Sequence, residues 1–98
     1  MKQPKDITAL QDAIQSMHGC RAFYSRTVHV REMFLGEVAW DGYVRVFALP
    51  DCPKAKHCFA WSYREGQETK TTVVLEIPPV DSPEAAVRAA IAAKGREK

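Results

Sequence analysis

The sequence predicts an α+β fold: a helix, a three- or four-stranded antiparallel sheet and a second helix, with both helices on one face of the sheet. Three patterns predict it: an apolar repeat of helical period over residues 7–17, alternation of period two between residues 20 and 77, and an alanine-rich stretch that begins at Ser82. The 98 residues fit a single domain, 1–98, in which we expect residues 1–5 and 95–98 to be flexible.

The first helix is predicted over residues 7–17, because apolar side chains recur there at spacings of three and four and form one stripe. The stripe consists of Ile7, Leu10, Ile14 and Met17. Either Asp6 or a capping box of Thr8 and Gln11 can begin this helix, and Gly19 can end it in a left-handed conformation.

Alternation of period two predicts the strands that follow. The first strand starts at Cys20, changes parity near Arg31 and Glu32 in a way that favours a β-bulge, and reaches a turn at Gly36–Glu37. In the second strand we expect a buried face, covered by both helices, that includes Trp40, Val44 and Val46.

Two prolines within Pro50–Lys56 interrupt the sheet before the alternation resumes at His57–Arg64. One face of this third strand carries Phe59, Trp61 and Tyr63. The polar segment Glu65–Glu68 predicts a hairpin connection, and the β-branched stretch Thr71–Ile77 predicts the last strand.

Ser82–Glu84 predicts the start of the second helix, with a capping hydroxyl, a proline in the first helical position and an acid in the first turn. Most of the following residues are alanine, so Val87 and Ile91 must anchor the helix, and Gly95 should end it. With two helices on one face, the other face of the sheet would be open to water or to a partner.

Composition excludes few function classes. The net charge is +2, which is too small to imply nucleic-acid binding by itself. No apolar run approaches the ~18 residues of a membrane helix. The start, Met1–Asp6, leads into a charged helix rather than a signal peptide, and the three cysteines, an odd number, disfavour a secreted disulfide framework. We therefore expect a cytoplasmic protein with no membrane partner.

Two segments carry a resemblance. Pro53–Ser62 (PKAKHCFAWS) and Leu75–Val87 (LEIPPVDSPEAAV) resemble a family of small uncharacterised bacterial proteins, over about residues 20–92. The resemblance implies no activity and no functional residue. The order of elements is also similar to that of the double-stranded-RNA-binding domain. Such domains open the second helix with a lysine-rich run, whereas this chain has the acidic Ser82–Ala86, which lacks the phosphate clamp.

The segment Asp51–Arg64 concentrates the unusual chemistry of the chain. Cys52, His57 and Cys58 could contribute to a zinc site, to which the first strand could add His18 and Cys20. There is no Cys-x-x-Cys knuckle, however, and the adjacent His57 and Cys58 face opposite ways on a strand. Lys54, Lys56 and His57 could lower the pKa of the Cys52 thiol, but no Cys-x-x-Cys motif, no glycine-rich oxyanion loop and no obvious Asp or Asn partner accompany it. Phosphate-binding loops and paired catalytic carboxylates are absent too. We predict no catalytic residue, no resident metal and no cofactor.

A binding surface is the remaining interpretation. We predict a small, non-enzymatic interaction domain that acts through an open sheet face and the loop and strand of residues 50–64. The predicted contact residues are Lys54, Lys56, His57, Trp61 and Arg64. The partner would be a protein or a second copy of this chain, paired through an exposed edge strand. The alternative is a nucleic-acid-binding module, because Arg21, Arg26 and Arg31 add cations that aromatic residues could accompany.

Overall fold

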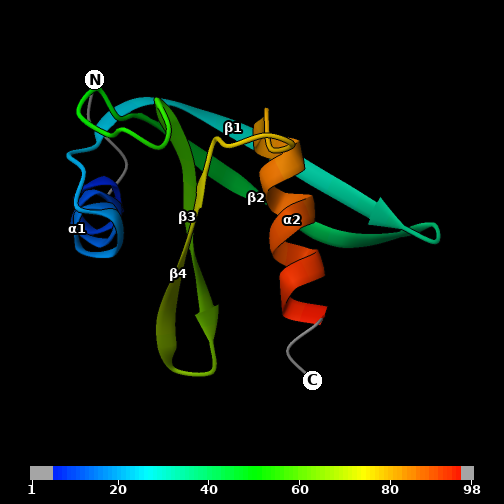
Figure 1. Cartoon of the computed structure of the whole chain (residues 1–98). Helices are drawn as coiled ribbons and strands as arrows, with labels where there is room; N and C mark the ends of the chain where they lie inside the picture. The colour runs from blue at the N-terminus through cyan, green and yellow to red at the C-terminus, as the bar shows by residue number, and fades with distance from the viewer. Residues whose placement is uncertain (1–5, 96–98) are drawn as a thin grey trace.

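The computed structural model describes residues 6–95, and it confirms the order of helix, antiparallel strands and helix (Figure 1). Residues 1–5 and 96–98, for which we predicted flexibility, lie outside the described residues. The elements are α1 (Ile7–His18), β1 (Phe23–Phe34), β2 (Glu37–Ala48), β3 (His57–Glu65), β4 (Glu68–Leu75) and α2 (Pro83–Gly95). No helix within residues 6–95 is both long enough and apolar enough to cross a membrane.

The four strands form one antiparallel sheet in the order β1-β2-β3-β4. β1 and β2 pair along a long hairpin, whereas β2 and β3 pair only where Arg45–Ala48 lies beside His57–Ala60. The register of β1 against β2 shifts once between Tyr24 and Arg26 and again between Glu32 and Met33. The second shift lies beside the bulge that the change in parity predicted.

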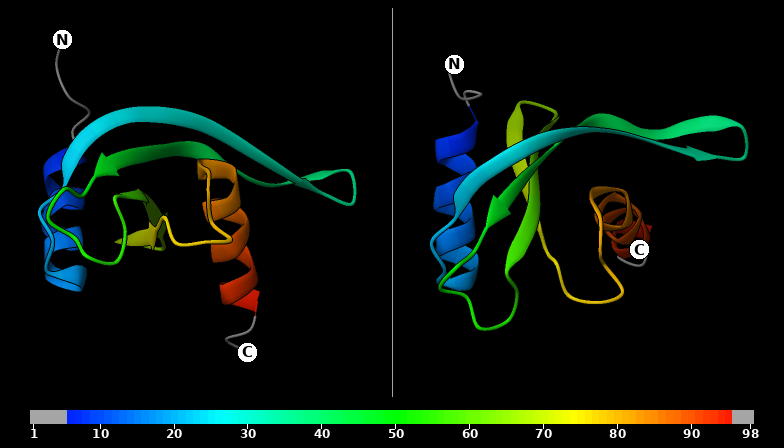
Figure 2. Two further views of the ribbon diagram at one scale, coloured as in Figure 1. Left: turned by 45° about the horizontal axis from the view of Figure 1, so that its top comes forward. Right: turned by 90° about the horizontal axis from the view of Figure 1, so that it is seen from above.

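The two helices lie on opposite faces of the sheet, so the prediction that both cover one face is wrong. Val46 and Phe47 are neighbours on β2, and successive side chains of a strand point to opposite faces. Phe47 packs in a cluster with Ile14 of α1, whereas Val46 packs in a second cluster with Val87 of α2. Figure 2 accordingly shows the β3–β4 hairpin between α1 and α2.

β3 explains why the patterns suggested only one buried face. Both of its faces are apolar, and four consecutive residues, Cys58–Trp61, are buried. A strand that is covered on both faces has no alternation of polar and apolar residues, so its sequence does not show which face each helix covers. The expectation of one open sheet face therefore fails over β3.

The α2 side of the sheet carries the core that the alternation of β2 predicted. Val44 and Val46 are buried there, which confirms the prediction, while Trp40 is half-buried and meets Trp61 edge to face at a ring separation of 5.4 Å. Val87 is fully buried and anchors α2 as expected, but Ile91 is 39% exposed and does not.

The start of α1 differs from the predicted caps. Asp6 makes no capping hydrogen bond with its side chain, and Gln11 instead donates from Nε2 to the carbonyl oxygen of Ala22 at 3.0 Å. Gly19 ends the helix with φ +69°, as predicted, but Met17 is 55% exposed although its spacing placed it in the apolar stripe.

In α2, Ser82 Oγ accepts a hydrogen bond from the Ala85 N–H at 3.1 Å, which confirms the predicted cap.

Candidate functional site

The structure brings three of the five predicted contact residues together. Lys54, Lys56 and His57 line a hollow of about 420 Å³ beside the loop that joins β2 to β3. Arg64 lies at the other end of β3, seven residues beyond His57, which corresponds to roughly 23 Å along a strand. Trp61 is 3% exposed and belongs to the core on the α2 side. One contiguous patch therefore contains the two lysines and the histidine only.

Cations outnumber acids in this hollow. His57 Nδ1 lies 3.2 Å from Glu76 Oε1, so the one acid that lines the hollow already has a basic partner. Lys54 and Lys56 are exposed, and neither forms an ion pair within the part of the chain that the structure describes. The hollow is therefore suited to a small anionic group rather than to a cation.

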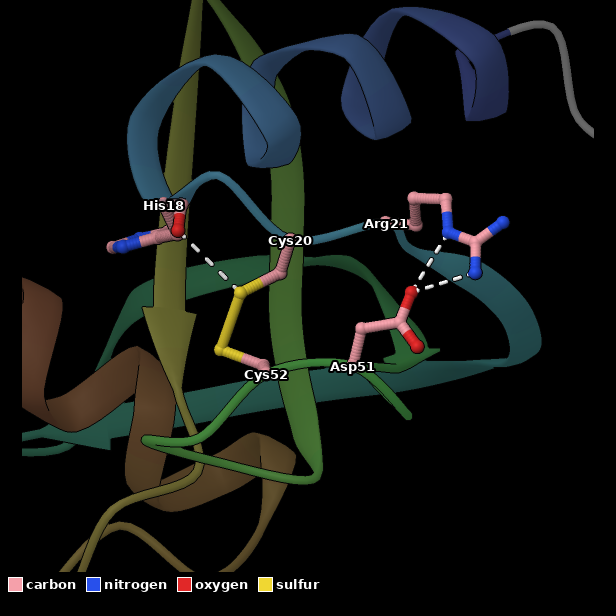
Figure 3. Close-up of a disulfide and its surroundings, with 5 residues drawn as sticks. All are labelled: His18, Cys20, Arg21, Asp51 and Cys52. Atoms are coloured by element: carbon pink, nitrogen blue, oxygen red, sulfur yellow. Dashed lines mark hydrogen bonds and ion pairs between the residues drawn. A yellow bond between two sulfur atoms is a disulfide. The ribbon is translucent and has the colours of Figure 1, made fainter.

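A disulfide between Cys20 and Cys52 holds this loop against the start of β1 (Figure 3). The odd number of cysteines counted against disulfides, but two of the three cysteines pair and only Cys58 is free. The two Cα atoms are 5.3 Å apart, within the usual range. Next to the disulfide, Arg21 Nε donates to Asp51 Oδ2 at 2.7 Å. Cys20 and Arg21, just before β1, thus hold Cys52 and Asp51 of the loop.

The third cysteine lies in the interior. Cys58 is fully buried in the cluster on the α1 side, and burial raises the pKa of its thiol to about 12. A thiol with such a pKa is almost entirely protonated near neutral pH and is a poor nucleophile.

Within residues 6–95, no three histidine, cysteine, aspartate or glutamate side chains group together as metal ligands.

The tip of the β1–β2 hairpin is an exposed apolar feature that the sequence analysis did not predict. Met33, Phe34, Leu35 and Val38 are 55%, 68%, 87% and 52% exposed. The hairpin runs past α2 and ends away from the rest of the molecule (Figure 2). The consecutive residues Met33–Leu35 are the signal that could have revealed it, because three adjacent apolar residues beside a turn cannot all face one core.

The turn itself is unusual in its backbone. Leu35 and Gly36 form the two-residue connection, one residue before the predicted turn, and both have positive φ, +53° and +79°. This conformation suits a β-hairpin and favours glycine, asparagine or aspartate. A leucine in the left-handed region costs roughly 1–2 kcal/mol.

A second unpredicted feature is a groove of about 520 Å³ between the β3–β4 hairpin and the C-terminal half of α2. Its lining includes the aromatic side chains Trp40, Trp61 and Tyr63, with Glu65 and Lys70 at the polar end. Tyr63 and Lys70 lie opposite each other on β3 and β4.

Most of the arginines that motivated the nucleic-acid alternative have acidic partners. Arg21 pairs with Asp51, and Arg31 pairs with Asp41 at 2.9 Å. Hydrogen bonds from His29 and then from Arg31 hold the pKa of Asp41 below its usual value. Arg26, the third of that series, is exposed. These acids reduce the positive charge that the β1–β2 hairpin presents.

Comparison of the chain with family models, with curated proteins and with solved structures finds no match. The resemblance to small bacterial proteins and the similarity to RNA-binding domains therefore stay predictions.

Proposed function

We propose that the protein is a non-enzymatic interaction domain that inserts the tip of its β1–β2 hairpin into an apolar pocket of a partner protein. One observation carries the proposal: Leu35 is 87% exposed and also has φ +53°. Exposure of a large apolar side chain and a left-handed backbone at the same residue are two separate costs to the free protein. Strain of this kind concentrates at functional sites.

Contact with a partner would offset these costs. Complete burial of one side chain of this size stabilises a complex by roughly 1.5–3 kcal/mol, and the tip offers Met33, Phe34, Leu35 and Val38. The hairpin that carries them has 12 residues in each strand, about twice the usual length of ~5–6. It therefore reaches beyond the domain and is suited to entering a cavity.

The charge beside the tip favours a protein over a lipid surface. Glu37 follows the turn directly and is exposed, whereas Glu32, just before the tip, already pairs with Arg88 at 3.3 Å. Anionic lipid headgroups would repel Glu37, whereas a pocket with cations at its rim would attract it. The small size of the tip indicates a partner that binds reversibly.

A photo-crosslinking residue in place of Leu35 tests the proposal, with the same residue in place of Gln67 as the matched control. Gln67 is exposed in the other hairpin turn of the sheet, next to Gly66. We expect a discrete crosslinked protein from position 35 alone, and we expect Met33→Ser with Phe34→Ser to abolish it. Equal crosslinking from both positions, or a product that persists in the serine variant, contradicts the proposed contact.

The predicted loop contact through Lys54, Lys56 and His57 is a separate proposal for an acidic partner, and it is supported by the two lysines that lack acidic neighbours. Arg64, on the other end of β3, would need a second contact. Nucleic acid is the weaker alternative, because acids accompany Arg21 and Arg31. Retention on a single-stranded nucleic-acid column at about 50 mM salt, lost in Lys54→Ala with Lys56→Ala, would favour it.

The compartment is also a proposal. The sequence predicts the cytoplasm, where disulfides are mostly transient, whereas they persist in oxidising compartments. A cytoplasmic location therefore implies that the Cys20–Cys52 bond opens and closes there. Trapping thiols in intact cells with an alkylating reagent measures the oxidised fraction, and a fully oxidised population contradicts the cytoplasm.

A further inference from the structure

We propose that Cys52 is a modification site, at which a small thiol that carries carboxylates opens the Cys20–Cys52 disulfide and forms a mixed disulfide with Cys52. The inference rests on the different surroundings of the two sulfur atoms and on the hollow beside one of them. It is independent of the proposed hairpin contact.

The two cysteines differ in exposure. Cys20 is 4% exposed and packs in the core under α1, among residues such as Leu10 and Phe47. Cys52 is half-buried and forms part of the wall of the hollow. Thiol–disulfide exchange requires the incoming sulfur to reach the sulfur that it attacks. The geometry therefore directs a small thiol to Cys52.

The hollow selects for negative charge. Its volume of about 420 Å³ admits a small organic molecule, and Lys54, Lys56 and His57 line it. A thiolate that also bears carboxylates is attracted by the lysines, and the same cations stabilise the negative charge that builds up at the sulfurs during exchange. A thiol whose only other charged group is an amine, such as cysteamine, lacks the attraction of the carboxylates.

The exchange is balanced in atoms and electrons. The incoming thiolate forms a bond to Cys52 Sγ, the Cys20–Cys52 bond breaks, and its electron pair leaves on Cys20 Sγ, which takes a proton from water. Cys20 Sγ lies 3.4 Å from the carbonyl oxygen of His18, so the new thiol can donate a hydrogen bond to that oxygen. Attack by a second thiol on the mixed disulfide releases a symmetrical disulfide and leaves both cysteines reduced.

The domain has other contacts that keep the loop near the sheet once the disulfide opens. Arg21 still pairs with Asp51, and the Leu49 N–H donates to the Lys56 carbonyl oxygen at 2.7 Å. Ala55, between the two lysines, is buried. Modification at Cys52 therefore changes the surface of the loop without unfolding the sheet, and it places a carboxylate beside Lys54 and Lys56.

Rates of disulfide opening with three probes test the charge selection: reduced glutathione, which is anionic, 2-mercaptoethanol, which is neutral, and cysteamine, which is cationic. Rates are compared per thiolate at low ionic strength. We expect glutathione to react roughly threefold to tenfold faster than cysteamine, and we expect 0.5 M salt to remove most of the difference. Equal rates for the three probes at low salt would overturn the proposal.

Paired variants assign the effect to the hollow. Lys54→Ala with Lys56→Ala should bring the glutathione to cysteamine ratio close to one. Arg64→Ala, which removes an exposed cation at the far end of β3, should leave the ratio unchanged. A ratio that falls equally in both variants would mean that net charge alone is responsible, and this would overturn the assignment to the hollow.

Peptide mapping after an acid quench locates the adduct. We expect glutathione on Cys52 in the wild-type protein. The serine variants have no disulfide to open, so they are treated with glutathione disulfide, which gives one glutathionyl group to the protein thiol and releases reduced glutathione. We expect a stable adduct on Cys52 in Cys20→Ser and little adduct on the buried Cys20 in Cys52→Ser. If the serine variants do not fold, the wild-type map alone decides. An adduct mainly on Cys20, or modification of the buried Cys58 at the same rate, would show that exchange requires unfolding and would overturn the proposal.

Discussion

Arg45 of β2 reaches the carboxylate of Asp6, the residue directly before α1, with 3.2 Å between the guanidinium Nε and the carboxylate oxygen. The Arg45 side chain is only 18% exposed, and its Nη1 also donates to Thr27 Oγ1 at 3.0 Å. The contact joins the first helix to the second strand across 39 residues of sequence. It takes the Asp6 side chain away from the capping role that the sequence predicted.

We expect Asp6→Ala to lower the free energy of unfolding by about 1–2 kcal/mol, because Arg45 loses its partner in a partly buried position. Urea denaturation followed by circular dichroism measures the change. Asp12→Ala is the matched control, since Asp12 is an exposed acid on the same helix. A loss of equal size in both variants would assign the effect to the charge of the helix rather than to this pair.

The placement of the helices on opposite faces predicts which pairs of substitutions interact. Val46→Ala should cost roughly 1–3 kcal/mol, and the cost should depend on Val87, which packs in the same cluster. Combination with Ile14→Ala, across the sheet, should be additive. Double-mutant cycles in urea measure both terms. Coupling of Val46 to Ile14 as strong as to Val87 would contradict this arrangement.

Reduction of the Cys20–Cys52 disulfide should destabilise the domain without changing its fold. The two cysteines are 32 residues apart, and the chain-entropy model gives about 3–4 kcal/mol for closing such a loop. Denaturation with and without a reductant measures the difference. The Cys20→Ser, Cys52→Ser double variant should be indifferent to the reductant, and sensitivity in that variant would assign the effect to other chemistry.

The His29–Asp41–Arg31 cluster predicts a specific dependence on pH. Hydrogen bonds from His29 and Arg31 lower the pKa of Asp41 from its usual 3.8 in the folded state. The folded state therefore binds the proton less tightly than the unfolded state, so the contribution is present above pH 3.8 and is lost as the pH falls through the lower folded value. Carbon-13 NMR titration of the Asp41 carboxyl measures this pKa, and a titration at or above 3.8 would contradict the contact.

The strain at Leu35 predicts a gain in stability on substitution. Leu35→Gly should raise the free energy of unfolding by roughly 0.5–1 kcal/mol, because glycine adopts a φ of +53° without a steric penalty. Leu35→Ala removes the same apolar surface and keeps the β-carbon, so it should bring no such gain. Thermal denaturation compares the two. A similar gain in both variants would point to the exposed side chain rather than to the backbone.

The sequence predicted the elements that local rules determine. The stripe of Ile7, Leu10 and Ile14, the cap at Ser82 and the buried pair Val44 and Val46 all follow from period and propensity. Met17 and Ile91 lie near the C-terminal ends of their stripes and stay 55% and 39% exposed, and this cannot be read from spacing. The side of the sheet on which α2 packs could not be predicted, because both faces of β3 are apolar and either face could bind a helix.

The candidate sites were less predictable. Lys54, Lys56 and His57 gather in the hollow because they are close in sequence, but the burial of Trp61 required knowledge of α2. The Cys20–Cys52 bond depends on how the chain returns after 32 residues, which an odd cysteine count cannot indicate. The exposure of the apolar tip was not predicted, because Met33 and Val38 continue an alternation of apolar residues that elsewhere in the sheet indicates burial.

The short pairing between β2 and β3, which joins the two hairpins, has a consequence for the cooperativity of unfolding. β2 and β3 pair only over Arg45–Ala48 and His57–Ala60, yet each helix also packs against the hairpin of the other half of the chain: α1 touches β3 and β4 as well as β1, and α2 touches β1 and β2 as well as β4. Each half of the chain alone would therefore leave part of its apolar surface uncovered. Separate peptides for residues 6–49 and 50–95 should each be unstructured alone and should regain structure only on mixing, so the fold is lost in one step rather than hairpin by hairpin.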